Sequence, residues 1–139
     1  MRRRITDADE GLIRRAWRTG RQKMFVDQLT GLQRAPAAAF DLRANEEALS
    51  VNVESSLRAA ELPLTWQVDF NKQYAVRVTV GDCSAKGLEV FHDPVLASPP
   101  DEPGNAHHGS IFGLQSMRTS NADAYEAAID ALARASRIV

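Results

Sequence analysis

The strongest pattern in this 139-residue chain is a pair of alternating stretches within residues 64–80, LTWQVDFNKQYAVRVTV. Apolar side chains occupy every second position in 64–70 and again in 74–80, which is typical of strands with one buried face. A three-residue loop, Asn71–Gln73, would set the apolar positions of both strands on the same face, whereas a two-residue loop would oppose apolar to polar residues. The pattern therefore predicts an antiparallel hairpin as the centre of a sheet.

Further elements are predicted on both sides of this hairpin. The capping-box pattern of Thr6 and Asp9, followed by apolar residues at helical spacing in GLIRRAW, predicts an amphipathic helix that ends at Gly20. A second helical stripe, capped by Ser120 or Asn121, predicts a C-terminal helix packed on the sheet. The remaining predictions are strands at 48–53, 88–92 and 106–114 and a short helix at 54–62. Residues 24–40 give no firm prediction.

These elements predict one α+β domain over residues 1–139, with a mostly antiparallel sheet of about five strands packed against N-terminal and C-terminal helices. Apolar residues make up 44% of the chain and charged residues 25%, as in ordinary globular domains. Cys83 is the only cysteine, which excludes an internal disulfide and a multi-cysteine zinc site. No apolar run is long enough to span a bilayer, and no apolar stretch follows the first arginines as in a secretory signal. We therefore expect a cytoplasmic protein without membrane contact.

The charge is distributed unevenly. Residues 1–23 carry a net charge of +5 and the rest of the chain carries −6, although the total is only −1. The predicted N-terminal helix would present Arg14, Arg15 and Arg18 on its outer face. A basic segment of this kind can bind an acidic protein, another copy of the chain, or nucleic acid.

A proline-rich segment, residues 93–105, separates two predicted strands. Long segments without regular structure are commonly functional in compact domains. If the flanking strands are neighbours, this loop brings His92, Asp93 and His107 to one end of the sheet. There a histidine could act as a base or as a ligand of zinc or iron, but no spacing matches a named metal motif, and we predict no metal and no cofactor.

Other catalytic arrangements have less support. Adjacent residues of a strand point to opposite faces, so His107 and His108 should not share one pocket. HGS at 108–110 is only half of a two-motif phosphoesterase signature, and Cys83 beside Asp82 favours a structural thiol over a nucleophile. The chain contains no GxSxG, P-loop, GxGxxG or HExxH motif.

The pieces DADEGLIRRAW, FDLRANEEALSVNVESS, VRVTVGD and HDPVLASPPDEPGNAHHGSI together resemble a group of short bacterial proteins of no established activity. Members of that group carry a leucine-serine-valine strand, matched here by Leu49–Val51, and an aspartate-proline loop, matched by Asp93 and Pro94. That loop ends in asparagine-proline-alanine-histidine, where this chain has GNAH. The resemblance implies no reaction, but it aligns His107 rather than His108 with the motif histidine.

The sequence therefore leads to three functional hypotheses. The first is a small cytoplasmic bacterial accessory or adaptor subunit that binds another protein, of the kind found in mobile-element or defence-type assemblies, through the basic segment and the 93–105 loop. The second is a small hydrolase or transferase with its site at His92, Asp93 and His107. The third is nucleic-acid binding through residues 2–23, which would weaken steeply with salt.

Overall fold

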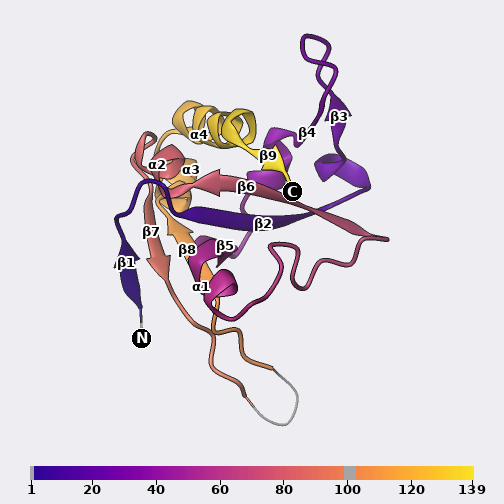
Figure 1. Ribbon diagram of the computed structural model, residues 1–139. Helices are drawn as coiled ribbons and strands as arrows, with labels where there is room; N and C mark the ends of the chain where they lie inside the picture. The colour runs from indigo at the N-terminus through magenta and orange to yellow at the C-terminus, as the bar shows by residue number, and fades with distance from the viewer. Residues whose placement is uncertain (1, 99–102) are drawn as a thin grey trace.

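The computed structural model describes residues 2–98 and 103–139, and within them the chain forms a large antiparallel sheet and a separate small hairpin (Figure 1). The large sheet has seven strands in the order β1-β7-β8-β5-β2-β6-β9. Its strands are β1 (Arg3–Ile5), β2 (Gly11–Trp17), β5 (Ala48–Val53), β6 (Gln73–Thr79), β7 (Glu89–His92), β8 (His108–Phe112) and β9 (Arg137–Ile138). The hairpin pairs β3 (Phe25–Val26) with β4 (Gln33–Arg34).

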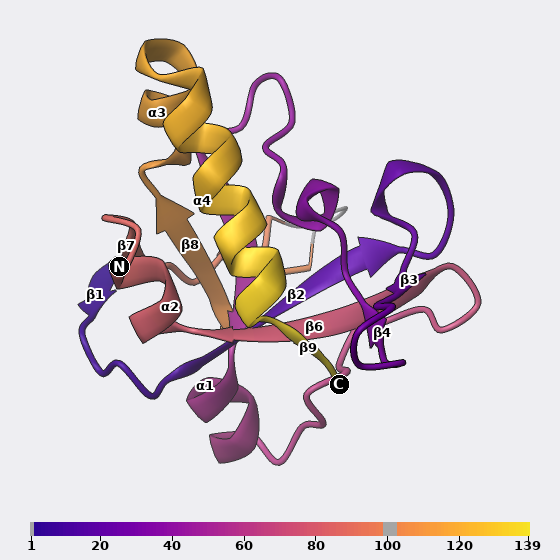
Figure 2. The same cartoon turned by 90° about the horizontal axis from the view of Figure 1, so that it is seen from above.

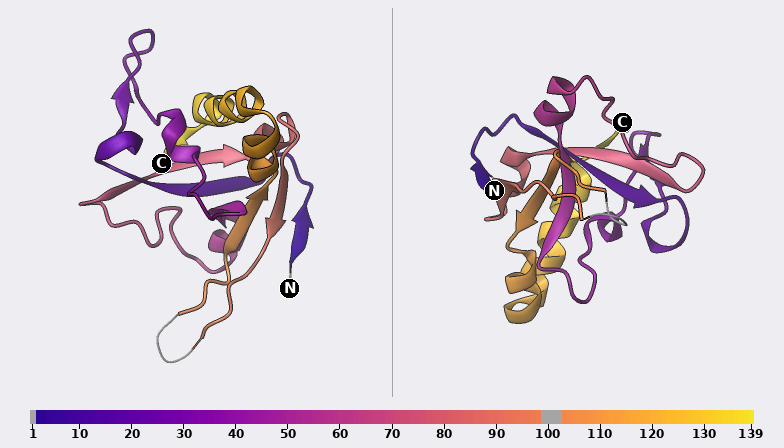
Figure 3. Two further views of the ribbon diagram at one scale, coloured as in Figure 1. Left: turned by 180° about the vertical axis from the view of Figure 1, so that it is seen from behind. Right: turned by 90° about the horizontal axis from the view of Figure 1, so that it is seen from below.

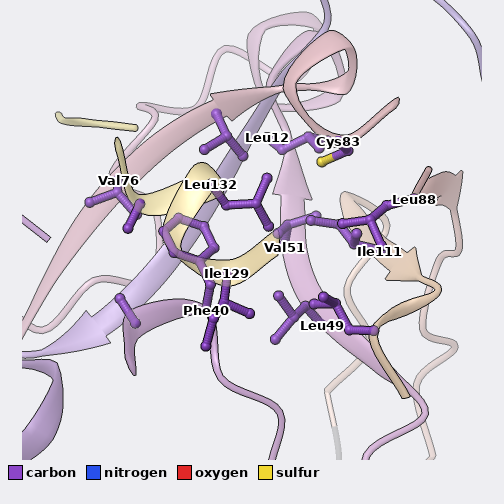
Figure 4. Close-up of a cluster of buried hydrophobic side chains, with 14 of the residues drawn as sticks. Leu12, Phe40, Leu49, Val51, Val76, Cys83, Leu88, Ile111, Ile129 and Leu132 are labelled. Atoms are coloured by element: carbon purple, nitrogen blue, oxygen red, sulfur yellow. The ribbon is translucent and has the colours of Figure 1, made fainter. Parts of the chain in front are cut away.

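Helices cover both faces of the sheet. They are α1 (Glu54–Ala59), α2 (Val80–Ser84), α3 (Leu114–Ser120), α4 (Ala122–Ala135) and the 3-10 helices η1 (Gly20–Gln22) and η2 (Ala37–Phe40). Helix α4 crosses one face and packs with η2 and α3 over the main core (Figure 2). Side chains from both layers interdigitate there, including Leu12, Val51, Ile111 and Leu132 (Figure 4). On the other face, α1 and the segment 60–72 cover a smaller cluster around Ile13 and Ala75.

The C-terminal helix confirms its sequence prediction. The Asn121 side chain caps α4 by accepting a hydrogen bond from the main-chain N–H of Ala124 at 3.1 Å. The predicted apolar stripe is buried, with Tyr125, Ile129 and Leu132 facing the sheet side of the core. The strand at 48–53 is confirmed residue for residue as β5, and β7, β8 and α1 lie within their predicted ranges.

The predicted N-terminal helix is wrong, because GLIRRAW forms β2 near the middle of the sheet. Leu12 packs in the main core and Ile13 in the cluster on the opposite face. A strand buried on both faces needs apolar residues at adjacent positions, and over seven residues that pattern also fits a helix. This strand and the short edge strands β1 and β9 join the predicted strands, whereas the predicted strand at 64–70 does not form, so the sheet has seven strands and not about five.

The predicted hairpin is also wrong, since only its second half is a strand. β6 pairs with β2 and β9, whereas residues 64–70 form successive turns. The N–H groups of Trp66 and Val68 bond to the carbonyls of Pro63 and Thr65. Alternating apolar side chains still reach the smaller cluster from these turns, so the pattern reflects burial without strand pairing.

Strands β2 and β5 diverge after a short stretch of pairing. They pair only at Leu12–Val53 and Ile13–Asn52, while β2 continues along β6 to Trp17. Arg14 bridges the gap, because its Nε donates to the carbonyl of Ala39 at 2.9 Å and its Nη1 to the carbonyl of Ser50 at 3.0 Å. The guanidinium thus links β5 to η2 where the ladder between β2 and β5 is interrupted.

We predict that Arg14→Ala lowers the free energy of unfolding by about 2 kcal/mol, because it leaves two carbonyls without their charged donor. Arg15→Ala removes one contact of an exposed side chain and should cost less than about 1 kcal/mol. Urea denaturation of the two variants checks this difference. Equal losses would contradict the bridging role of Arg14.

A buried ion pair joins α1 to β6. Both oxygens of Glu54 are engaged, one by Arg58 at 2.8 Å and the other by Arg77 at 2.9 Å. Gly11 leaves room for the pair, since a Cβ there would lie 1.9 Å from Glu54 Oε2. Burial alone would raise the pKa of Glu54, but the hydrogen bonds from the two arginines outweigh it and lower that pKa below its usual value.

We therefore predict that Glu54→Gln destabilises the protein at pH 7 by about 2 kcal/mol. Because the native pKa is lowered, the carboxylate's contribution is complete above the ordinary glutamate pKa of about 4.3 and is lost as pH falls through the native pKa. The difference between wild type and variant in urea denaturation should accordingly shrink between pH 6 and pH 3. A difference that stays constant or grows over this range would contradict the assignment.

Candidate functional site

The arginines of the predicted basic helix lie on β2 and on the residue following it, where they bond to the main chain. Besides Arg14, the Nη1 of Arg15 donates to the carbonyl of Gln67 at 3.1 Å, and Nε of Arg18 donates to the carbonyl of Gln73 at 2.8 Å. Arg14 is partly buried, and this burial lowers its pKa from the ordinary value. The three side chains therefore do not form one exposed basic helix face.

A groove of about 230 Å³ opens where β2 and β5 diverge. Its lining is mostly polar and includes Arg14, Arg15, Trp17, Asp41, Arg43, Glu46 and Ser50. A smaller pocket of about 50 Å³ adjoins it and is lined by Asn52, Asn105 and His108 among others. Arg15 and Ser50 line both cavities, so they lie at the junction between them.

The strands that flank the 93–105 loop are neighbours, so the condition for bringing its two ends together is met. β7 and β8 are antiparallel, with His92 opposite Gly109, and Val95 and Asn105 form a further bridge beyond them. Residues 99–102, which include two of the loop's prolines, lie outside the described residues. The pairing thus brings the two ends of the loop together beside β5.

The predicted catalytic residues have separate partners at this place. His92 Nε2 contacts the carbonyl of Ala106 at 2.8 Å. The Asp93 carboxylate accepts a hydrogen bond from Ser110 Oγ at 3.1 Å and lies 3.6 Å from Arg2 Nη2.

His107 is directed toward another part of the fold. Its Nδ1 lies 2.7 Å from Ser56 Oγ on α1, and its ring packs edge-on against Trp66 at 5.1 Å between centroids. The side chains of His92, Asp93 and His107 thus bond to different partners and not to one another. Catalysis by these three residues stays a prediction. Within residues 2–98 and 103–139, no group of three or more His, Cys, Asp or Glu side chains is placed to hold a metal ion.

His108, in contrast, is held between two oxygen atoms. Its Nδ1 lies 2.8 Å from the main-chain oxygen of Asp93, and its Nε2 lies 3.1 Å from Ser50 Oγ. This pair has no counterpart among the sequence predictions, because Ser50 and His108 meet only through the pairing of β5 with β8. No local spacing signals a contact between residues so far apart in the chain.

The β3–β4 hairpin is a second feature that no local sequence pattern predicts. It rises from the body of the molecule near the end of α4, away from the segment that directly follows β7 (Figures 1 and 3). Leu29 is 97% exposed and Leu32 66%, and at the base of the hairpin Phe25 and Val26 are about half exposed. Several exposed large apolar side chains on one projecting element are typical of an interaction surface.

The tip of this hairpin is held by its own hydrogen bonds. The Asp27 carboxylate accepts from the N–H of Leu29 at 2.8 Å and pairs with Arg34 at 3.1 Å, and both contacts lower the pKa of Asp27. The N–H of Gly31, which has a φ of +72°, donates to the carbonyl of Asp27 at 2.7 Å. The exposed leucines are therefore presented by an ordered turn.

Cys83 lies in the core and is fully buried. Burial, with a smaller contribution from Asp82, raises the pKa of its thiol to about 12. A thiol with this pKa is protonated at neutral pH and is a poor nucleophile.

We predict that Cys83 reacts with an aromatic disulfide reagent only as fast as the protein unfolds. Rates measured in native buffer should be at least about a hundredfold below those in 6 M guanidinium, where the thiol is exposed. Comparable rates in the two conditions would show a reactive cysteine.

Comparison of the chain with protein-family models, with curated proteins and with solved structures found no match. Among the helices in the described part of the chain, none has the length and apolar character needed to cross a membrane.

Proposed function

We propose that this protein is a cytoplasmic bacterial accessory or adaptor subunit that binds another protein through the β3–β4 hairpin. The observation that carries the proposal is the exposure of Phe25, Val26, Leu29 and Leu32 on one projecting hairpin. Burying an exposed leucine side chain contributes about 1.5–3 kcal/mol, so a few such contacts form the centre of a stable interface.

The chemistry of the hairpin indicates the kind of partner surface. Between Met24 and Arg34 the only charged residues are Asp27 and Arg34, and these two neutralise each other. An apolar projection without net charge is complementary to an apolar groove on a partner whose electrostatic potential is weak. The internal hydrogen bonds of the tip reduce the entropy that would be lost when the leucines dock.

The basic N-terminal segment gives weaker support to nucleic-acid binding than its sequence suggests. Arg14, Arg15 and Arg18 donate to main-chain carbonyls, and Trp17 is the only aromatic residue within 2–23 that could stack on a base of single-stranded nucleic acid. The hairpin carries no net charge and therefore lacks the positive charge that binds a phosphate backbone. We therefore place the binding surface on the hairpin.

The test uses a photoreactive amino acid at Gln28, which is exposed at the tip, in the full chain expressed in its own host. We expect one discrete adduct with a second polypeptide, whose cross-linked peptide identifies the partner. With that partner purified, Leu29→Asp combined with Leu32→Asp should weaken binding at least about tenfold, because two charges would enter the apolar groove.

Leu96→Asp is the matched control, since Leu96 is 82% exposed and belongs to the segment after β7, which runs away from the hairpin (Figure 1). It should leave the affinity unchanged. Loss of binding with Leu96→Asp but not with the double variant would move the surface to the 93–105 loop and overturn the proposal. An adduct formed only between two copies of the chain, or only with lipid, would also overturn it.

A further inference from the structure

The groove between β2 and β5 ends at a serine–histidine pair that the proposed binding function does not use. β5 and β8 pair Ser50 with Ser110 and Asn52 with His108, so Ser50 and His108 are diagonal neighbours on one face of the sheet. Gly109 allows this close pairing, because a Cβ there would lie 2.9 Å from a methyl group of Val53. The pair is thus positioned by the sheet itself.

The hydrogen bonds of His108 define the roles of its two ring nitrogens. A carbonyl oxygen can only accept, so Nδ1 of the neutral ring must carry the proton that bonds to the main-chain oxygen of Asp93 at 2.8 Å. Nε2 is then unprotonated, and it accepts from the hydroxyl of Ser50 at 3.1 Å. Ser50, His108 and the Asp93 carbonyl are therefore joined by hydrogen bonds as a nucleophile, a base and a group that orients the base.

We propose that Ser50 is a nucleophile activated by His108, and that the site cleaves small carboxylic esters bearing a negative charge. Ser50 is exposed and lies at the junction of the two cavities, where a substrate carbonyl can approach it. Arg15 lines the same junction, and only one of its N–H groups is used in its contact with Gln67. A carboxylate on the substrate would pair with the remaining donors of that guanidinium.

The reaction is a two-step acyl transfer to water. Ser50 Oγ bonds to the ester carbonyl carbon while its proton moves to His108 Nε2, and the carbon–oxygen bond to the alcohol breaks as the alcohol takes that proton. Water then attacks the acyl-serine, giving a proton to Nε2. The acyl–oxygen bond breaks, Ser50 recovers the proton, and the carboxylic acid leaves.

The test measures labelling of the purified full chain by a small alkyl fluorophosphonate, followed by intact mass and peptide mapping. We expect a single phosphonyl adduct on Ser50, no adduct with Ser50→Ala, and labelling at least about a hundredfold slower with His108→Gln. Ser110→Ala is the matched control, because Ser110 lies opposite Ser50 and bonds to the Asp93 carboxylate instead. It should label at the wild-type rate.

Substrate charge is tested with two activated esters, p-nitrophenyl acetate and the mono-p-nitrophenyl ester of succinate. Arg15→Ala should raise KM for the succinate ester at least about tenfold and leave KM for the acetate unchanged.

In the labelling test, absence of an adduct, an adduct on another residue, or wild-type labelling of folded His108→Gln would overturn the proposal of a Ser50–His108 site. If His108→Gln does not fold, the comparison of Ser50→Ala with Ser110→Ala decides. The Leu29→Asp, Leu32→Asp variant should label normally, so this test and the binding test fail independently.

Discussion

The arrangement of the whole sheet depends on how β2 is hydrogen-bonded along its two edges. It pairs with β6 along all of its length but with β5 only at Leu12 and Ile13. Beyond these two pairs, Arg14 donates to the main-chain carbonyl of Ser50 on β5 and to that of Ala39 in η2. Arg14 thus bridges the gap between the two strands, and the groove that reaches Ser50 lies where they separate.

The two candidate surfaces have opposite character. The hairpin presents apolar side chains to solvent, and none of Phe25, Val26, Leu29 or Leu32 lines the groove. The groove is polar, and Arg14 and Arg15 in its lining each donate to main-chain carbonyls. A partner docked on the hairpin and a small anionic ester in the groove would therefore be recognised by different forces, burial of apolar area and charge pairing.

Much of the secondary structure could be predicted from local patterns, but the pairing of the strands could not. The alternation in 48–53 and the stripe of α4 predicted their elements because each buries a single face. The helix predicted for GLIRRAW was wrong because a strand buried on both faces has the same apolar pattern as a short helix. The strand predicted for 64–70 was wrong because turns can also bury alternate side chains. The contact of Ser50 with His108 depends on a register between distant strands, and residues 24–40 carried no periodic signal for the hairpin.

The central claim is that the β3–β4 hairpin, and not the arginines or the 93–105 loop, contacts another protein. Radical footprinting of the native complex purified from the host tests it most directly, because oxidation rates report the solvent exposure of individual side chains. We expect Phe25, Leu29 and Leu32 to become protected relative to the free protein, while Leu96 keeps its rate. Protection of Leu96 with unchanged oxidation of the hairpin would contradict the account.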